Sequence, residues 1–344
     1  MEIAKRMAGV MDTSGQGAGD VWSVRCRGLA QAISLAENDP LSVLPVLTHP
    51  LVTSHLPQVS PWVVGITGLP GAGKSTLISL AVGVLRSRGL KVAVLAVDPS
   101  SPQTGGAILG DRIRMQDHFK DPEVFIRSMG SRGAMGGISH ATRSALHLLR
   151  TLDFDVILLE TVGVGQNESE VLNLADSTVL VLMPNSGDEI QLMKAGVFQS
   201  CDVYVVNKAD LHDPSRLVQE LEENAHLNAL SIGSPWTPEV CATHQNDPQS
   251  VGKMLDLVFK HQKLVRSHPE FERVKVNKAA KDVARLVMDV LEPEVVKHLL
   301  NREQEGLREL VRGTEVTATL AKKLVHQIST PWPPTEVFQS SDFS

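Results

Sequence analysis

The run Gly68-Leu69-Pro70-Gly71-Ala72-Gly73-Lys74-Ser75 matches the phosphate-binding pattern G-x-x-x-x-G-K-[ST] at every fixed position. Trp62 to Thr67, just before it, are apolar or β-branched and predict a buried strand, and Thr76 to Val82 predict a helix. A strand, a glycine loop and a helix in this order are the context that the pattern needs. An ordinary glycine turn before a helix is the alternative, and it accounts for neither the lysine nor the hydroxyl.

Each part of this loop suits a phosphate group. The glycines let backbone N–H groups close around phosphate oxygens, and the helix that follows adds the positive end of its dipole. Lys74 can reach the β- and γ-phosphates, which gives it a catalytic role, and Ser75 can bind Mg²⁺. The loop residues that we expect to contact the nucleotide are Gly68, Gly71, Ala72, Gly73, Lys74, Ser75 and Thr76.

The composition limits the classes of protein to consider. The chain has 344 residues, 42% of them apolar, which suffices for one large α/β domain with extensions. A net charge of -6 argues against a nucleic-acid-binding protein. Cys26, Cys201 and Cys241 are too scattered for a disulfide framework or a zinc site. No apolar run suggests a membrane span, and residues 1–20 resemble neither a secretory signal nor a transit peptide. We therefore expect a cytoplasmic protein without nucleic-acid or membrane partners.

The apolar runs after residue 61 predict the core. Strands are expected at residues 62–67, 91–98, 124–127, 154–160, 177–183 and 203–206, with a short strand or strand end at 238–242. Helical patterns separate most of them, so the fold class is α/β with a doubly wound, mostly parallel sheet, and the domain spans residues 62–266. In such a sheet, functional groups lie at the carboxyl ends of the strands. Lys74, Asp98, Glu160 and Asn207 all occupy such positions.

Helical extensions flank this core. Residues 1–61 predict helices from Val21 to about Leu47, with a break at Asp39-Pro40, and a proline-containing connector from Thr48 to Pro61. Residues 267–344 predict further helices, broken at Pro293, and a frayed polar end. This C-terminal extension either covers the core or, as we expect, serves as a dimerisation arm.

A second motif lies about 130 residues after the glycine loop. Asn207-Lys208-Ala209-Asp210 fits N-K-x-D, the guanine-reading signature of GTPases. The aspartate accepts protons from guanine N1 and N2, and adenine offers no such pair of donors. The alternative is a polar turn after a strand. Ala242 is a candidate backbone donor to guanine O6, although it equally fits the end of a strand.

Acidic residues at strand ends are the candidates for Mg²⁺. Glu160 closes an apolar strand and can hold the ion directly or through water, and Gly163 can offer its N–H to the γ-phosphate. Asp98 and Asp111 are equally able to contact Mg²⁺ or the attacking water. The alternatives are a buried structural acid for Glu160, an Asp-Pro turn for Asp98 and a helix N-cap for Asp111.

The remaining charged residues give weaker predictions. His140 and His147 share a helix, but no carboxylate or cysteine cluster joins them, so we expect no histidine metal site. One of the arginines near the loops can act on the γ-phosphate, and the sequence does not distinguish Arg112, Arg114, Arg127, Arg132 and Arg143.

Several stretches together closely resemble the MeaB/ArgK/MMAA group of GTPases. The group looks like metallochaperones of cobalamin-dependent acyl-CoA mutases such as methylmalonyl-CoA mutase. The resemblance runs from about Arg27 to at least Phe259. The stretches that carry it are 27–30, 94–101, 104–106, 109–111, 160–166, 187–191 and 235–238.

The resemblance implies a SIMIBI-type G domain in a homodimer. It implies GTP hydrolysis with Mg²⁺ as cofactor and GTP or GDP as ligand, and it implies that hydrolysis gates cobalamin loading and protection of a mutase. Ser75, Asp98, Asp111 and Glu160 become Mg²⁺ ligands or water-positioning groups. Residues 99–111, 162–170 and 185–196 become three switches ordered by the γ-phosphate. The expected switch and partner residues are Gln166, Asp188, Glu189 and Lys194.

The sequence departs from the family pattern in three places. Arg112-Ile113-Arg114 stands where the family commonly has Lys-Thr-Arg. Arg127 to Arg132 replaces a Pro-Ser-Pro stretch, and Lys194-Ala195 replaces a pair of basic residues. These departures concern the identity of the partner mutase more than the GTPase activity.

Other functions use the same glycine loop. A P-loop kinase for a protein or small molecule needs an acceptor pocket and a base, and no motif for either is evident. A nickel-insertion GTPase normally shows a His- or Cys-rich metal store. A nucleotide-gated binding module would not hydrolyse its ligand. We expect slow intrinsic GTP hydrolysis that a partner accelerates, because no catalytic arginine is evident.

Overall fold

The computed structural model describes residues 1–9, 21–98, 115, 118–130, 140–161, 174–184 and 201–302. The chain divides into two compact units, Met1–Lys275 and Val276–Ser344. The first unit holds the sheet and the glycine loop. The described part of the second unit belongs to one long helix, α12 (Pro269–Arg302), which begins in the first unit.

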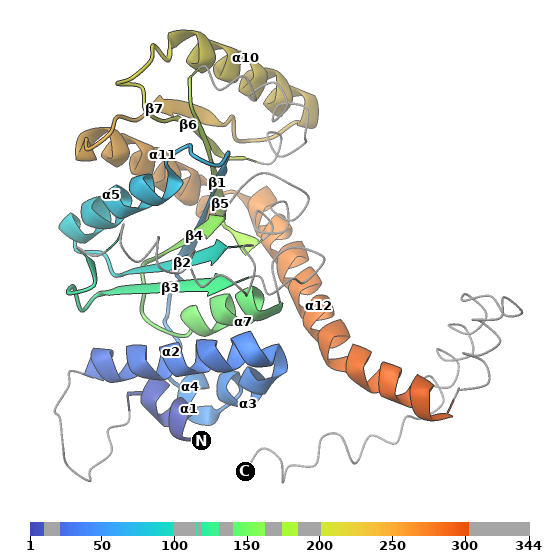
Figure 1. Cartoon of the computed structure of the whole chain (residues 1–344). Coiled ribbons are helices and arrows are strands. Elements are labelled where there is room, and N and C mark those ends of the chain that lie inside the picture. The colour runs from blue at the N-terminus through green and yellow to red at the C-terminus, as the bar shows by residue number, and fades with distance from the viewer. Residues whose placement is uncertain are drawn as a thin grey trace, which may run out of the picture. The chain divides into compact units, whose positions relative to one another are not determined.

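The described strands form one sheet in the order β3-β2-β4-β1-β5-β6-β7 (Figure 1). Every neighbouring pair is parallel. The strands are β1 (Trp62–Gly68), β2 (Val92–Asp98), β3 (Val124–Gly130), β4 (Val156–Thr161), β5 (Ser177–Leu182), β6 (Val203–Val206) and β7 (Glu239–Ala242). The prediction of a doubly wound parallel α/β sheet is confirmed.

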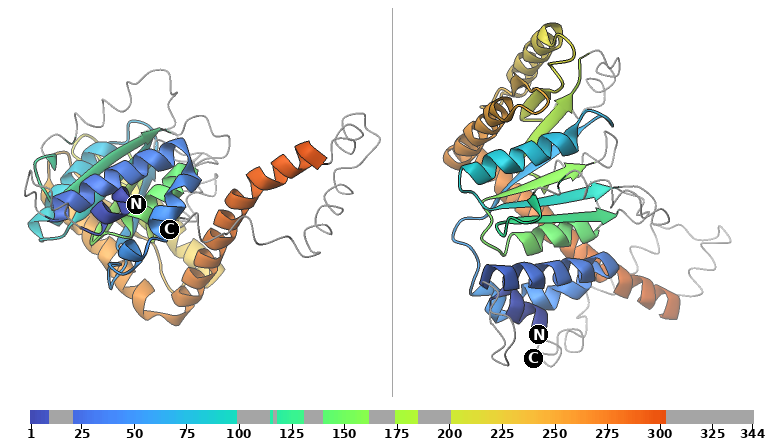
Figure 2. Two further views of the ribbon diagram at one scale, coloured as in Figure 1. Left: turned by 90° about the horizontal axis from the view of Figure 1, so that it is seen from below. Right: turned by 60° about the vertical axis from the view of Figure 1, so that its left-hand side comes forward.

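The central strands are apolar because both of their faces are covered. Every residue of β1, β4, β5 and β6 is buried. On one face lie α5 (Lys74–Ser87) and α11 (Pro248–Ser267), whose apolar residues share a core with Val64 and Val94. On the other face, α7 (His140–Leu149) lies between the sheet and α2 (Val21–Asn38), and α10 (Ser215–Ile232) packs on β5 and β6 (Figures 1 and 2).

Local signals explain where these helices begin and end. Asp247 caps α11 by accepting hydrogen bonds from the N–H groups of Gln249 and Ser250, and Pro248 occupies the first turn. The helix α10 ends at Gly233, which has a φ of 63°. Glycine tolerates this left-handed conformation, and Ser234 N–H then donates to Ala229 O at 3.0 Å.

Helices are present where the sequence predicts them, between Val21 and Leu47, and they are α2 (Val21–Asn38), the 3-10 helix η1 (Pro40–Val43) and α3 (Leu44–Leu47). Two more helices, α1 (Glu2–Met7) and α4 (Pro50–Thr53), lie outside that prediction. Of these elements, α2 and η1 contact α7. Arg25 of α2 connects α1 to the segment after α7, because its guanidinium donates to Met7 O, Thr151 O and the carboxylate of Asp153. The connector expected from residue 48 thus begins with the short helix α4.

Two other boundaries differ from the sequence analysis. Strand β3 continues three residues beyond Arg127, where we expected the strand to end. As the edge strand of the sheet, it buries only Phe125 and Met129 fully, so its sequence does not read as an apolar run. The helix α12 runs through Pro293, where we expected a break. A proline removes one hydrogen bond and bends a helix without always ending it.

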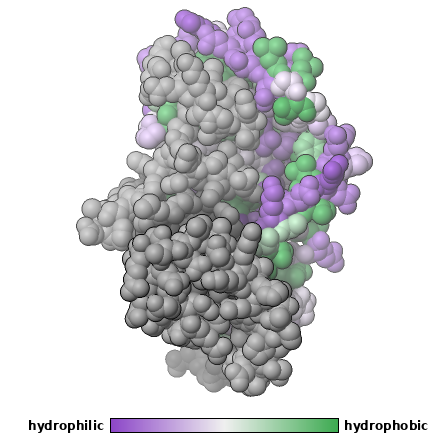
Figure 3. Space-filling model, turned by 90° about the vertical axis from the view of Figure 1, so that its right-hand side faces the viewer, coloured by the Kyte–Doolittle hydropathy of each residue, from purple (hydrophilic) through white to green (hydrophobic). Residues whose placement is uncertain are grey.

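Some apolar side chains of the first unit face solvent. Figure 3 shows them among hydrophilic residues near the end of the molecule at which α10 lies, and on α10 the exposed ones are Leu227, Leu230 and Ile232. None of the helices in the described ranges has a stretch apolar and long enough to cross a lipid bilayer.

Candidate active site

The glycine loop joins β1 to α5 with backbone angles that favour glycine. Gly68, Gly71 and Gly73 have φ values of 144°, 80° and 89°. A Cβ at Gly68 would lie 2.1 Å from Val181 O, and a Cβ at Gly73 would lie 2.5 Å from Asn207 Nδ2. Gly68 and Gly73 are therefore fixed by conformation and by space. Helix α5 begins at Lys74, so its N-terminus points at the loop.

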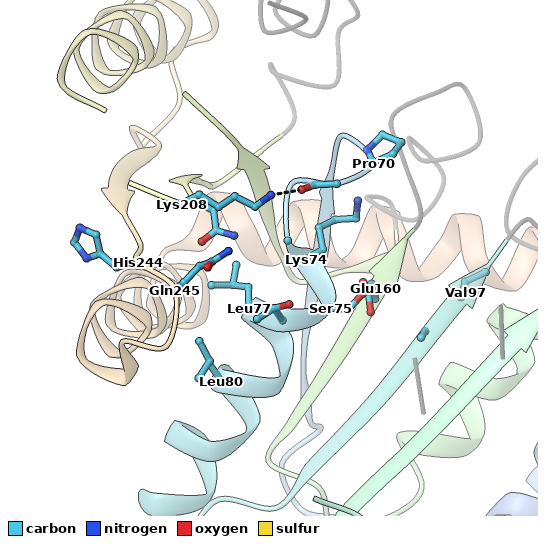
Figure 4. Close-up of a pocket in the computed structure, with 15 residues that line it drawn as sticks. Pro70, Lys74, Ser75, Leu77, Leu80, Val97, Glu160, Lys208, His244 and Gln245 are labelled. Carbon is cyan, nitrogen blue, oxygen red and sulfur yellow. Dashed lines mark hydrogen bonds between the residues drawn. The ribbon is translucent and has the colours of Figure 1, made fainter. Parts of the chain in front are cut away.

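A cavity of about 440 Å³ lies along this loop (Figure 4). The loop and α5 form one wall through Pro70, Gly71, Gly73, Lys74, Ser75, Thr76, Leu77 and Leu80. The other walls come from the carboxyl ends of the strands, namely Ala96, Val97, Glu160, Asn207 and Lys208, and from His244 and Gln245 after β7. The parallel register brings these distant segments to one edge of the sheet, as we predicted for Lys74, Glu160 and Asn207.

Lys74 lies at the glycine-loop end of the cavity, and loop carbonyls accept hydrogen bonds from its ammonium. Its ammonium donates to Gly68 O at 2.7 Å and to Leu69 O at 3.0 Å, and the residue is only 6% exposed. A buried lysine that bonds neutral carbonyls can transfer its donors to an anionic oxygen. This geometry therefore suits the arrival of a phosphate group.

Ser75 and Glu160 meet at the same end. Ser75 Oγ donates to Glu160 Oε1 at 2.6 Å, although the two residues are 85 positions apart. A hydroxyl and a carboxylate are hard oxygen donors of the kind that Mg²⁺ prefers. The pair therefore fits Mg²⁺, and Ser75 and Glu160 are the described residues that would hold it. A bound Mg²⁺ would neutralise charge on the phosphates.

Asn207 connects the loop to the far end of the cavity. Its Nδ2 donates to Ala72 O at 2.8 Å, and its Oδ1 accepts from Thr243 Oγ1 at 2.9 Å. Lys208 has a positive φ of 59° and donates from its ammonium to Gly71 O at 2.8 Å, a bond drawn in Figure 4. Both residues thus bond backbone carbonyls of the glycine loop.

Asp210 is held by the segment that follows β7. Its Oδ1 accepts from the backbone N–H of Gln245 at 3.0 Å, and Ala209 N–H donates to Thr243 O at 3.1 Å. A carboxylate fixed in this way can accept a pair of N–H groups from a base, as the N-K-x-D motif requires.

The other predicted site residues are distributed as follows. Four of them do not line the cavity, and their ligand roles stay predictions: Gly68, Ala72, Asp210 and Ala242. Ala242 belongs to β7 and pairs there with Val206 of β6. Asp98 is the last residue of β2, so its backbone lies at the same edge of the sheet. Outside the described residues lie Asp111, Gly163, Gln166, Asp188, Glu189, Lys194, Arg112, Arg114 and Arg132, and with them the three expected switches.

Two arginines considered above fall within the described residues. Arg127 in β3 bonds Ser34 and Glu37 of α2 and does not line the cavity. Arg143 belongs to α7, and it does not line the cavity either.

Sequence reasoning missed several residues of the site. Leu77 and Leu80 line the cavity from the second turn of α5, and His244 and Gln245 line it opposite them (Figure 4). For His244 and Gln245, the position two and three residues after β7 was the available signal, because the carboxyl ends of all strands share one edge. Thr243 carries no motif and is found only from its hydrogen bond to Asn207.

The thiols near the sheet do not suggest a nucleophile. Burial raises the pKa of Cys241 to about 12, and burial raises the pKa of Cys201 well above its usual value. A thiol reacts as its thiolate, so neither residue suits covalent catalysis. In the described part of the chain there is also no group of three or more His, Cys, Asp or Glu residues that could hold a metal ion.

Comparisons with known proteins place the chain in a family. A family model described as "Methylmalonyl Co-A mutase-associated GTPase MeaB" matches residues 29–299. A putative GTPase of Pyrococcus horikoshii is 37% identical over 87% of this chain and 93% of its own length. The GTPase ArgK of Escherichia coli is 32% identical over 80% of this chain and 82% of its own length.

Two further matches extend the comparison. The "Methylmalonic aciduria type A homolog, mitochondrial" of Caenorhabditis elegans is 34% identical over 75% of this chain and 66% of its own length. A solved structure titled "LAO/AO transport system kinase" aligns with a TM-score of 0.60 over 96% of this chain and 97% of its own, at 23% identity, which indicates the shared fold alone. The chain therefore belongs to the family of the methylmalonyl Co-A mutase-associated GTPase MeaB, a family of P-loop GTPases.

Proposed function

We propose that this chain is a Mg²⁺-dependent GTP hydrolase whose nucleotide cycle gates cobalamin loading and protection of a methylmalonyl-CoA mutase-type enzyme. One observation carries the hydrolase part. A single cavity has Lys74, Ser75 and Glu160 at one end and Asn207, Lys208 and Gln245 at the other. The backbone N–H of Gln245 also holds the carboxylate of Asp210. Such a cavity suits a ligand with phosphates at one end and a guanine base at the other.

The residues divide the work as follows. Lys74 moves its donors from loop carbonyls to phosphate oxygens and stabilises the charge that grows during hydrolysis. Ser75 and Glu160 hold Mg²⁺. Asp210 accepts the N1 and N2 protons of guanine, and an adenine nucleotide leaves that carboxylate without its partners. Asp98 and Asp111 remain our candidates, with Glu160, for placing the attacking water.

The mutase part of the proposal has separate support. The family description names a mutase-associated GTPase, and the relative from C. elegans is named for methylmalonic aciduria type A. We propose a cytoplasmic homodimer whose switches, with Gln166, Asp188, Glu189 and Lys194, respond to the partner. The alternative of a P-loop kinase is distinguished by its need for an acceptor.

The nucleotide part is tested by phosphate release from GTP and from ATP without any acceptor. We expect Mg²⁺-dependent release from GTP, and we expect Asp210→Asn to reduce the preference for GTP over ATP by about 100-fold or more. Asp213→Asn is the matched control, because Asp213 lies three residues after Asp210 and its carboxylate accepts hydrogen bonds from the N–H and hydroxyl of Ser215 at the start of α10. Equal use of ATP and GTP by the native chain would refute the proposal.

The partner part is tested with a purified cobalamin-dependent methylmalonyl-CoA mutase from the same source. We expect the mutase to accelerate GTP hydrolysis and to receive cobalamin only when the chain has a hydrolysable nucleotide. If hydrolysis proceeds but the mutase changes neither its rate nor its own cofactor loading, the chaperone role is wrong and the GTPase role stands.

A further inference from the structure

Thr243 is hydrogen-bonded at three positions to the end of β6 and the residues that follow it. The residue follows β7 directly and is fully buried. Its N–H donates to Val206 O at 2.9 Å, and its carbonyl accepts from Ala209 N–H at 3.1 Å. Its hydroxyl donates to Asn207 Oδ1 at 2.9 Å. Its backbone therefore continues the β6–β7 pairing past the end of the sheet, and its side chain contacts the guanine-reading motif.

The direction of these bonds follows from the chemistry of the groups. Ala72 O can only accept, so the Asn207 atom that lies 2.8 Å from it is the amide nitrogen. The other terminal atom, Oδ1, therefore faces Thr243, and the threonine hydroxyl must be the donor. A chain of two hydrogen bonds thus joins the end of β7 to the glycine loop through one buried amide.

Space around the glycine loop makes this arrangement tight. Asn207 is only 6% exposed, and its Nδ2 would lie 2.5 Å from a Cβ at Gly73. A small rotation of the Asn207 side chain therefore moves it either against the loop or off Ala72 O. Since Gln245 N–H also holds Asp210, the segment from Thr243 to Gln245 orients both Asn207 and Asp210 of the N-K-x-D motif.

We propose that Thr243 is a positioning residue that sets how long a guanine nucleotide stays bound. Its hydroxyl holds Asn207 in the orientation that ties the phosphate-binding loop to the guanine-reading segment. Without that hydroxyl, the two ends of the site lose their shared support and the nucleotide leaves faster. This inference rests on the proposed binding of guanine nucleotides.

The test compares dissociation rates of a fluorescent GDP analogue by chasing with excess GDP. Thr243→Val keeps the shape and removes the donor, so we expect dissociation to become about 10-fold faster, the factor that corresponds to one lost buried hydrogen bond. Thr243→Ser keeps the hydroxyl, so its dissociation rate should stay within about 3-fold of the native value.

The control must lose a comparable bond elsewhere. Thr151→Val serves, because Thr151 is buried, donates from its hydroxyl to Leu148 O at 2.7 Å and lies outside the cavity. A merely structural role for Thr243 predicts that both valine variants melt earlier and release the GDP analogue at the native rate. We expect only Thr243→Val to change the release rate.

The outcomes separate the two proposals. If the native chain binds guanine nucleotides but Thr243→Val releases them no faster than Thr151→Val, the positioning role is refuted. If the native chain shows no preference for guanine nucleotides, the proposed function fails and the inference fails with it. A double variant with Asn207→Ala adds a second check, because two residues acting through one bond should show non-additive effects.

Discussion

Replacing Gly73 by alanine should disturb the site through Asn207 as well as through the backbone. At Gly73 φ is 89°, and the new Cβ would lie 2.5 Å from Asn207 Nδ2. Gly71 offers a matched position, because its φ is 80° and a Cβ there meets no atom within 4 Å. Both alanine variants therefore carry similar backbone strain, about 1–2 kcal/mol, and only Gly73→Ala also collides with Asn207.

The collision has a calculable consequence. A contact of 2.5 Å cannot persist, so Asn207 must move away from the loop and give up its bond to Ala72 O. A buried polar pair that loses its bond costs about 1–3 kcal/mol. We therefore expect Gly73→Ala to be less stable than Gly71→Ala by about 1–3 kcal/mol, or several degrees in melting temperature for a chain of this size.

Thermal unfolding without nucleotide measures this difference, because the ligand then cannot contact the new methyl group. Binding of GTP against ATP, measured on the same samples, should show a smaller preference for guanine in Gly73→Ala than in Gly71→Ala. If the two variants melt at the same temperature and keep the same preference, Asn207 is not held as the structure has it, and the reasoning from its bond to Ala72 is wrong.

Three further outcomes follow from the structure. Burial lowers the pKa of His261 from 6.5 to about 4, so between these pH values the unfolded chain binds a proton that the folded chain does not. The free energy of unfolding therefore has its full His261 contribution above pH 6.5 and falls by about 3 kcal/mol as the pH drops to 4. Urea unfolding at several pH values should show that this free energy depends less on pH in His261→Gln than in the native chain. Glu160→Gln should lower GTP hydrolysis about 100-fold and raise the Mg²⁺ concentration needed for half-maximal rate, since an amide binds Mg²⁺ more weakly than a carboxylate. Gly68→Ala should fail to accumulate as folded protein, because its Cβ would lie 2.1 Å from Val181 O, and a yield of soluble, cooperatively melting protein equal to that of Gly71→Ala would contradict this.

The fold could be predicted because its strongest signals are local. Strands β1, β4 and β5 are buried on both faces and so read as continuous apolar runs. The edge strand β3 gives a weaker signal, which predicts only residues 124–127. It fully buries only Phe125 and Met129, and Arg127 in its middle bonds Glu37 of α2, 90 positions earlier. A long-range ion pair of this kind satisfies a charge at the position where the sequence predicts the end of the strand.

The site could be predicted where a motif is contiguous, or where a polar residue such as Glu160 ends an apolar strand. The glycine loop and Asn207 to Asp210 each occupy one short stretch, so the spacing of residues is enough to recognise them. The bond between Ser75 and Glu160 joins residues 85 positions apart, and Gln245 reaches Asp210 across 35 positions. Such contacts depend on the order of strands in the sheet, which no spacing rule along the chain supplies.

The phosphate end and the base end of this cavity should not act independently. Lys74 uses the carbonyls of Gly68 and Leu69 as partners, while Asn207 uses the carbonyl of Ala72 in the same loop. A phosphate that draws the Lys74 ammonium away from these carbonyls changes the conformation of the loop on which Asn207 depends. The free energies of binding the base and the phosphates should therefore be non-additive, and the loop itself, rather than a distant switch, is the shortest physical path between them.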